Sequence, residues 1–120
     1  LRQANVALRA FTLDELIAEK LRALLQQPIR NRNRRQDVYD IALLLDEGPL
    51  DDALRVTILE TLIEKCRSRG IKPTRESIDD PEVAGRAQRD WETLRLEVSD
   101  LPPFEKRFAA VREFYRSLPW

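Results

Sequence analysis

Apolar residues recur at helical spacing in five stretches of the chain, and capping or helix-breaking residues separate those stretches. The first stretch follows Thr12, which forms a capping-box pattern with Glu15, and it extends to Pro28, where the helix is expected to end. The second predicted helix covers residues 35–46 and follows a basic connector at residues 29–36. The apolar positions of these two helices are Leu13, Leu16, Ile17, Leu21, Leu24 and Leu25 in the first, and Val38, Ile41, Ala42 and Leu45 in the second.

Three further helices are predicted in the remainder of the chain. The third begins at Asp51 or Asp52 and ends near Ser68, with Gly70 as its C-terminal glycine cap. After a loop over residues 71–80, the fourth is capped by Asp80, has Pro81 in its first turn, and carries the apolar positions Ala84, Ala87, Trp91 and Leu94. Pro102 and Pro103 precede the fifth, whose apolar positions are Phe104, Phe108, Val111, Tyr115 and Leu118. The pattern predicts an all-α, five-helix bundle-like fold in a single helical domain over residues 1–120. We expect residues 1–11 to be the remnant of an upstream sheet domain.

Composition supports a helical fold and excludes several kinds of chemistry. Only 3 of the 120 residues are glycine, which is few for a strand-rich fold with tight hairpins. The chain has no histidine, so it cannot form a Ser-His-Asp triad, a Cys-His pair or a histidine-ligated zinc site. Its one cysteine excludes an internal disulfide and fits a reducing compartment. No apolar run approaches the roughly 20 residues that a membrane helix needs, so no membrane partner is expected. The chain opens on Leu1 and lacks methionine, and we therefore expect upstream residues to be missing.

Lys20 lies within the apolar face of the first predicted helix, one turn from Leu16, Ile17 and Leu24. A lysine there costs free energy unless its ammonium group finds a partner or reaches water. One interpretation is a lysine whose aliphatic stem covers apolar surface while the ammonium group extends into solvent. The alternative is a lysine directed at an anion such as a phosphate or a carboxylate.

Asp37 and Asp40 lie on one face of the second predicted helix, because they are three residues apart. One interpretation places Asp37 on the helix dipole in the first turn and pairs Asp40 with a nearby arginine. The alternative is that a carboxylate here binds a metal or accepts a proton.

The basic connector forms a local positive patch on a chain whose 21 basic and 21 acidic residues give zero net charge. Its arginines are Arg30, Arg32, Arg34 and Arg35. Most such runs are solvated connectors, whereas a phosphate-bearing partner is the functional alternative, since guanidinium groups match phosphate oxygens. The chain has no glycine-rich phosphate-binding loop.

Two segments at this separation form a combined motif: Glu19-Lys20-Leu21-Arg22-Ala23-Leu24, and Arg35-Gln36-Asp37-Val38-Tyr39-Asp40. The motif resembles the second half of the AbiEii/AbiGii nucleotidyltransferase toxins. The resemblance covers about residues 5–118 and is strongest over residues 13–45. A weaker similarity, to the C-terminal end of the family, comes from Trp91, Leu94 and the helix that starts at Phe104.

This resemblance implies the C-terminal helical part of a polymerase-beta-like nucleotidyltransferase, a bacterial, cytoplasmic toxin of toxin–antitoxin and phage-defence (abortive infection) systems. The implied reaction moves a nucleotide from an NTP to an acceptor such as tRNA, with Mg²⁺ in the full-length protein and a cognate antitoxin protein as partner. The family's lysine matches Lys20, which would hold nucleotide phosphates. Its aspartate matches Asp37 or Asp40, and we favour Asp37, although this chain has Arg35-Gln36-Asp37 where the family usually has Arg-Asp. The arginines expected to flank the triphosphate or the RNA are Arg22, Arg30, Arg32, Arg34 and Arg35.

The family's catalytic metal site is a Gly-Ser turn with an Asp-x-Asp pair, and neither occurs before Thr12. Two-metal phosphoryl transfer needs clustered carboxylates that hold Mg²⁺ against the triphosphate. We therefore expect that this chain alone binds neither metal nor cofactor and transfers no nucleotide, because it depends on a missing N-terminal domain. Two alternatives to an enzyme part are a non-catalytic helical module that binds RNA or protein, and an inert scaffold with Lys20 extended into solvent.

Overall fold

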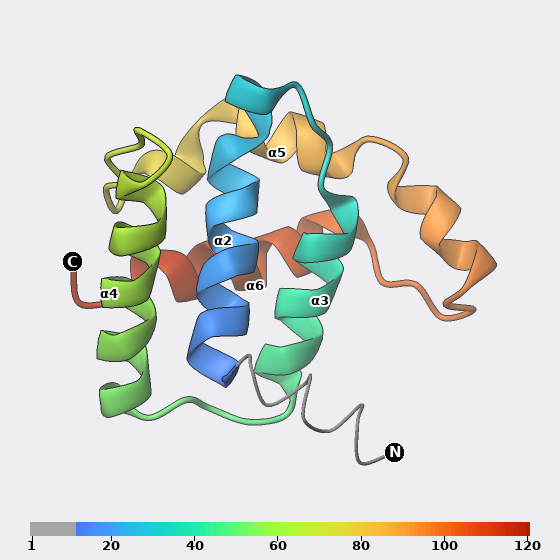
Figure 1. Ribbon diagram of the computed structural model, residues 1–120. Coiled ribbons are helices and arrows are strands. Elements are labelled where there is room, and N and C mark those ends of the chain that lie inside the picture. Colours follow the sequence, from blue (N-terminus) through green and yellow to red (C-terminus); the bar gives the residue numbers. More distant parts are fainter. Residues whose placement is uncertain (1–11) are drawn as a thin grey trace, which may run out of the picture.

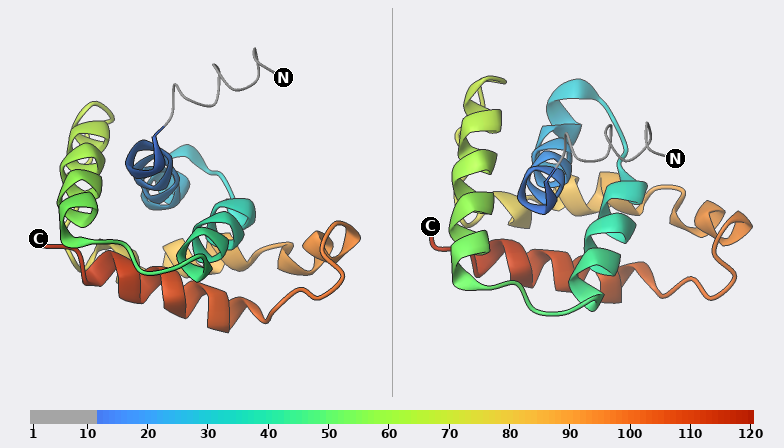
Figure 2. Two further views of the ribbon diagram at one scale, coloured as in Figure 1. Left: turned by 90° about the horizontal axis from the view of Figure 1, so that it is seen from below. Right: turned by 60° about the horizontal axis from the view of Figure 1, so that its bottom comes forward.

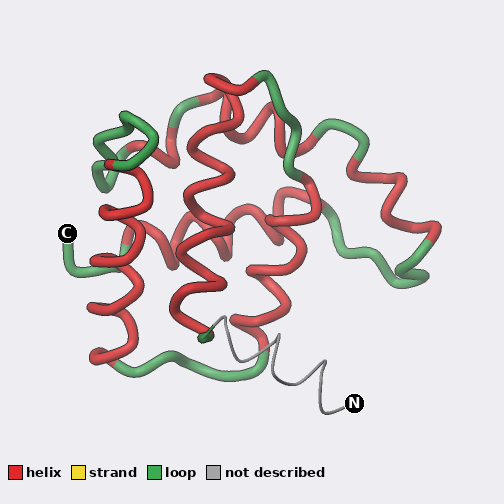
Figure 3. Tube along the Cα trace, in the orientation of Figure 1, coloured by secondary structure: helices red, strands yellow, loops and turns green. Residues whose placement is uncertain are grey.

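The structure, a computed structural model, describes residues 12–120, and every regular element in this part of the chain is helical (Figures 1 and 3). Its α-helices are α2 (Leu13–Arg30), α3 (Arg35–Asp46), α4 (Asp52–Arg67), α5 (Pro81–Gln88) and α6 (Phe104–Arg116). Two short 3-10 helices join them, η1 (Ser77–Asp79) and η2 (Trp91–Leu96). The predictions of an all-α fold and of five α-helices are therefore confirmed for these residues. The predicted sheet remnant at residues 1–11 lies outside the described residues.

Three of the helices begin where the sequence places a capping side chain. The Thr12 hydroxyl accepts a hydrogen bond from the Glu15 N–H at 3.4 Å, ahead of α2. The Asp51 carboxylate accepts one from the Leu54 N–H at 2.8 Å, ahead of α4. The Asp80 carboxylate caps α5 in the same way. Each cap satisfies one of the backbone N–H groups that a first helical turn leaves without a partner.

The predicted end of the first helix at Pro28 is wrong, because α2 continues through this proline to Arg30. A proline has no N–H, so the Leu24 carbonyl loses the hydrogen bond that residue 28 would normally donate. The side-chain amide of Gln27 replaces that donor, at 3.0 Å from the Leu24 oxygen. The helix then ends at Asn31, whose left-handed backbone (φ 54°) turns the chain and whose N–H bonds to the Gln27 carbonyl.

The fourth predicted helix is broken into two elements. Helix α5 ends at Gln88, and Asp90 adopts a left-handed conformation (φ 62°) that an α-helix cannot contain. Trp91 and Leu94 lie on η2 instead, yet both are buried, as their spacing predicted. The indole N–H of Trp91 donates to the Pro102 carbonyl at 3.0 Å, so a hydrogen bond as well as packing holds this ring.

Helix α2 lies between α4 and α3, and α6 crosses behind the three (Figures 1 and 2). Helix α2 packs against α4, α3 and α5, while α6 packs against α3 and η1. One apolar core joins these elements, and its fully buried side chains include Ile17, Leu21, Ile41, Ile58 and Tyr115. The end of α2 lies at the top in Figure 1, close to the end of α4 and the loop that leads into α3. None of the described helices combines the length and the apolar character that a membrane crossing requires.

Candidate functional site

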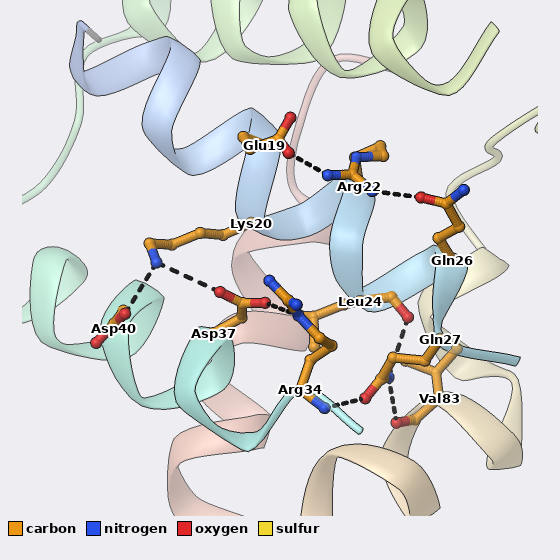
Figure 4. Close-up of polar contacts among 10 residues, drawn as sticks. All are labelled: Glu19, Lys20, Arg22, Leu24, Gln26, Gln27, Arg34, Asp37, Asp40 and Val83. Carbon is orange, nitrogen blue, oxygen red and sulfur yellow. Dashed lines mark hydrogen bonds and ion pairs between the residues drawn. The ribbon is translucent and has the colours of Figure 1, made fainter. Parts of the chain in front are cut away.

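Lys20 on α2 faces two carboxylates on α3 (Figure 4). Its ammonium nitrogen lies 2.8 Å from Asp40 Oδ2 and 3.3 Å from Asp37 Oδ1. Burial lowers the pKa of Lys20, but the hydrogen bond to Asp40 and the charge of Asp37 outweigh it and raise that pKa above its usual value. Lys20 is therefore a charged, half-buried ion-pair partner, and its ammonium group does not simply extend into solvent.

Asp37 is the most deeply buried member of this cluster, with 4% of the residue exposed. Its second carboxylate oxygen accepts a hydrogen bond from Arg34 Nε at 2.6 Å, so two cations contact one carboxylate. Asp40 is held by Lys20 and by the side-chain amide of Gln36, at 2.9 Å. Asp37 occupies the first turn of α3, as the first interpretation placed it, and it also contacts Lys20. Asp40 pairs with a lysine rather than with an arginine. Lys20, Arg34, Asp37 and Asp40, the polar cluster, carry two positive and two negative charges.

Gln27 fixes the position of Arg34 relative to α2. Its fully buried side chain donates to the carbonyls of Leu24 and Val83, each at 3.0 Å, and its oxygen accepts the Arg34 backbone N–H at 2.8 Å (Figure 4). A buried amide with all of these partners rigidly links the end of α2, the start of α3 and α5. Asp37 follows Arg34 by three residues, so this link also determines where the polar cluster forms.

Beside the polar cluster lies the arginine pocket, about 260 Å³ in volume, between the end of α2 and the end of α4. Its lining residues are Arg22, Ala23, Gln26, Arg30, Arg32, Arg34 and Arg69. Among residues 12–120, no carboxylate lines this pocket. Arg34 belongs to both sites, because it lines the pocket and bonds to Asp37. The polar cluster and the arginine pocket are therefore adjacent.

Arg22 forms the buried part of the arginine pocket. Its guanidinium group donates to Glu19 and to the side-chain oxygen of Gln26 (Figure 4). Burial raises the pKa of Glu19, but the hydrogen bond and charge of Arg22, together with Lys65, outweigh it and hold that pKa below its usual value. The Nε atom of Arg22 is buried and has no hydrogen-bond partner among the described residues. This ion pair orients Arg22 along the wall of the pocket.

The structure brings together most of the site residues that the sequence suggested. Lys20, Asp37 and Asp40 form the polar cluster, and four of the five candidate arginines line the arginine pocket. Arg35 does not join them, because its Nε donates to the Thr93 hydroxyl at 3.0 Å, on η2. Tyr39, which lies between the two aspartates in the sequence, packs with its ring 6.4 Å from that of Trp91.

Sequence reasoning missed several residues of the site, and Gln27 and Arg69 are the most important of them. Gln27 offered a signal, since it is a polar residue one position before a proline within an apolar helix. Arg69 offered none, because only the packing of α4 against α2 brings it to the arginine pocket.

These features define the class of protein: an all-α domain with a partly buried lysine–carboxylate cluster next to a pocket of arginines. The family model described as nucleotidyl transferase AbiEii toxin, Type IV TA system, matches residues 2–114. The chain belongs to this family of nucleotidyltransferase toxins. No curated protein and no solved structure matches the chain.

Nucleotidyltransferases of this kind use Mg²⁺ and an NTP, so the fit of the described residues to a metal ion matters. Among residues 12–120, no three histidine, cysteine, aspartate or glutamate side chains lie close enough together to hold a metal ion. Asp37 and Asp40 stand side by side, but Lys20 and Arg34 already neutralise them. The polar cluster therefore does not fit Mg²⁺ by itself, whereas a lysine and an arginine fit phosphate oxygens.

Proposed function

We propose that this chain is the C-terminal helical domain, residues 1–120, of a nucleotidyltransferase toxin that moves a nucleotide from an NTP to an acceptor such as tRNA. Lys20, Asp37 and Asp40 are its contribution to the active site. The observation that carries the proposal is the contact of the Lys20 ammonium group with both carboxylates across two helices. Family membership supplies the reaction class.

In such a transfer, an acceptor hydroxyl attacks the α-phosphorus of the NTP, a new phosphodiester bond forms, and pyrophosphate leaves. The triphosphate brings negative charge that a preorganised cation stabilises without further reorganisation. In the proposal, Lys20 exchanges part of its contact with Asp40 for a phosphate oxygen. Asp37 stays anchored by Arg34 and keeps the lysine charged and oriented.

The proposal assigns the metal ligands to an upstream domain, so the 120-residue chain alone is inactive. The full-length protein would act in the bacterial cytoplasm, as the toxin of a phage-defence system controlled by a cognate antitoxin protein. An assay of the 120-residue chain with NTP, Mg²⁺ and tRNA tests the first point. Transfer that depends on Lys20 in this chain alone would overturn it.

The active-site assignment is tested in the full-length protein by transfer of labelled NTP to tRNA. Lys20→Ala and Asp37→Asn should each lower the transfer rate by about 100-fold or more, the effect of removing a group that stabilises transition-state charge. Lys106→Ala, an exposed lysine on α6, should keep the rate of the unaltered protein. Folded Lys20→Ala protein that transfers at the unaltered rate would exclude Lys20 from the active site.

The arginine pocket favours a second candidate, a non-catalytic module that binds RNA. Phosphate-driven binding weakens steeply as the salt concentration rises. RNA binding by this chain should show that salt dependence whether the chain is part of an enzyme or a binding module. The two functions differ in their need for Lys20. A module without chemistry would show no NTP-dependent labelling of tRNA in the full-length protein, with or without the Lys20→Ala change.

A further inference from the structure

The arginine pocket has more positive charge than its own surroundings neutralise. Arg22 is paired with Glu19, and Arg34 with Asp37. Within residues 12–120, the side chains of Arg30, Arg32 and Arg69 form no ion pair, and residues 1–11 contain no aspartate or glutamate that could supply one. Three exposed guanidinium groups therefore converge on one pocket without a counter-charge from this chain.

The residues that line the arginine pocket also indicate what kind of anion the pocket can bind. Besides its five arginines, the described lining contains only Ala23 and Gln26. It offers no aromatic ring on which a base could stack and no apolar wall that could hold a nucleoside. A pocket of this type recognises phosphate groups, whose oxygens match guanidinium donors, and ignores the base.

Its position suggests which phosphates these are. The arginines come from two places far apart in the sequence, the segment 22–34 and Arg69 beyond α4, and the fold brings them together on one basic surface around the pocket. That surface continues directly into the polar cluster through Arg34. A phosphodiester backbone can place one phosphate in the pocket and continue toward the polar cluster, whereas the described lining has no aromatic or apolar wall for the nucleoside of an NTP.

We infer that the arginine pocket binds the phosphate backbone of the acceptor RNA, with Arg32 and Arg69 as its main contacts, and delivers the RNA end to the polar cluster. The identity of the nucleic acid as the acceptor rests on the proposed function. The binding itself does not, because it needs neither NTP nor chemistry. Arg69 is the decisive residue, since it lies outside the segment that carries the polar cluster.

The test is binding of fluorescein-labelled tRNA to the full-length protein without NTP, measured by fluorescence anisotropy over a series of salt concentrations. The Arg32→Ala/Arg69→Ala double variant should bind several-fold more weakly. The slope of log affinity against log salt should fall by about one for each arginine removed. Both side chains are exposed, so the variant should fold, which its circular dichroism and melting temperature check.

Two further variants make the result specific. Arg69→Lys keeps the charge and should recover most of the salt slope. Arg95→Ala removes an exposed arginine on η2, which lies at the opposite side of the molecule from the end of α4, and should bind as the unaltered protein does (Figure 1). Equal weakening by Arg95→Ala and Arg69→Ala would show non-specific attraction to basic surface and would overturn the inference.

The alternative occupant is the triphosphate of the NTP. If the double variant binds tRNA normally but has a raised KM for NTP, the pocket holds the nucleotide and the inference is wrong. Failure of the proposed function would give a different result. RNA binding would still depend on Arg32 and Arg69, but neither the unaltered protein nor any variant would transfer a nucleotide to tRNA. Lys20→Ala separates the two sites, because it should lose transfer while binding tRNA normally.

Discussion

The side-chain oxygen of Gln27 accepts a hydrogen bond of 2.8 Å from the backbone N–H of Arg34, and this contact joins the end of α2 to the start of α3. The same amide supplies the donor that Pro28 cannot offer to the Leu24 carbonyl. One buried side chain thus completes an interrupted helix and orients the arginine that anchors Asp37.

Gln27→Leu should destabilise the chain by about 2–4 kcal/mol, because it leaves the buried Leu24 carbonyl and the Arg34 N–H without these partners and removes a donor to the Val83 carbonyl. Gln27→Glu should also destabilise it, since a carboxylate cannot donate to either carbonyl. Urea unfolding measures both changes. Gln88→Leu, an exposed glutamine at the end of α5, is the matched control and should stay within about 0.5 kcal/mol. An equally small effect at Gln27 would show that its hydrogen bonds contribute little.

The Lys20–Asp37 contact should show energetic coupling in a double-mutant cycle of Lys20→Met and Asp37→Asn. Each single change removes one partner of this contact, and the double variant removes both, so it should lose less stability than the two single losses together. We expect a coupling of about 1–3 kcal/mol, measured by urea unfolding. The exposed pair Arg95–Glu92 should give about 0.5 kcal/mol or less. Additive losses at Lys20 and Asp37 would contradict the importance of their contact.

Cys66 should make the chain less stable in mild alkali. Burial raises the pKa of its thiol from 9.0 to about 11, so the folded protein keeps a proton that the unfolded chain releases. Stability is then lost as pH rises above the unfolded value, by at most about 1.4 kcal/mol per pH unit for one group. Unfolding free energies at about pH 8 and about pH 10 should fall more in the unaltered chain than in Cys66→Ala. Equal falls would mean that the folded thiol ionises normally.

Asp79 should contribute modestly to stability at neutral pH and nothing in strong acid. The hydrogen bond from Arg112, at 2.5 Å, and the charges of Arg112 and Arg116 hold the pKa of this carboxyl below its usual value. A lowered carboxyl pKa stabilises the fold above the unfolded pKa, and the effect disappears as pH falls through the folded pKa. Asp79→Asn should therefore lower the free energy of unfolding at neutral pH by less than about 1 kcal/mol, since the pair is exposed, and leave it unchanged in strong acid. Urea unfolding at the two pH values measures the difference. A loss that persists in acid would point to packing instead of charge.

Local sequence signals predicted the helices well where capping chemistry was explicit. Thr12 and Asp80 each cap a helix as expected, because a cap depends only on residues within one turn. Asp51 caps α4 at one of the two predicted starts of the third helix. The errors fall where a tertiary partner decides the outcome. Pro28 does not end α2 because Gln27 replaces the missing donor, and Asp90 breaks the fourth helix although Trp91 and Leu94 keep helical spacing.

The same distinction between local sequence signals and tertiary contacts applies to the site. Lys20, Asp37 and Asp40 were predicted from helical spacing and from resemblance, and the structure places them in contact because α2 packs against α3. Their catalytic roles remain a prediction. The arginine pocket needed the fold, since Arg69 and Arg22 meet only where α4 packs against α2, and Arg35 turns away to Thr93.

The arginine pocket has a consequence for how this chain meets a charged molecule. Net charge is zero, so the five arginines of the pocket are balanced by an excess of five acidic residues over the rest of the sequence. Glu19 and Asp37 pair with Arg22 and Arg34, whereas Arg30, Arg32 and Arg69 form no ion pair within residues 12–120. These three arginines give the molecule a locally positive surface without a net charge. A polyanion at a distance is hardly attracted, but at close range it exerts a torque that rotates the domain until the pocket faces it. The charge distribution therefore affects the orientation in which the domain meets a polyanion more than it affects how often the two meet.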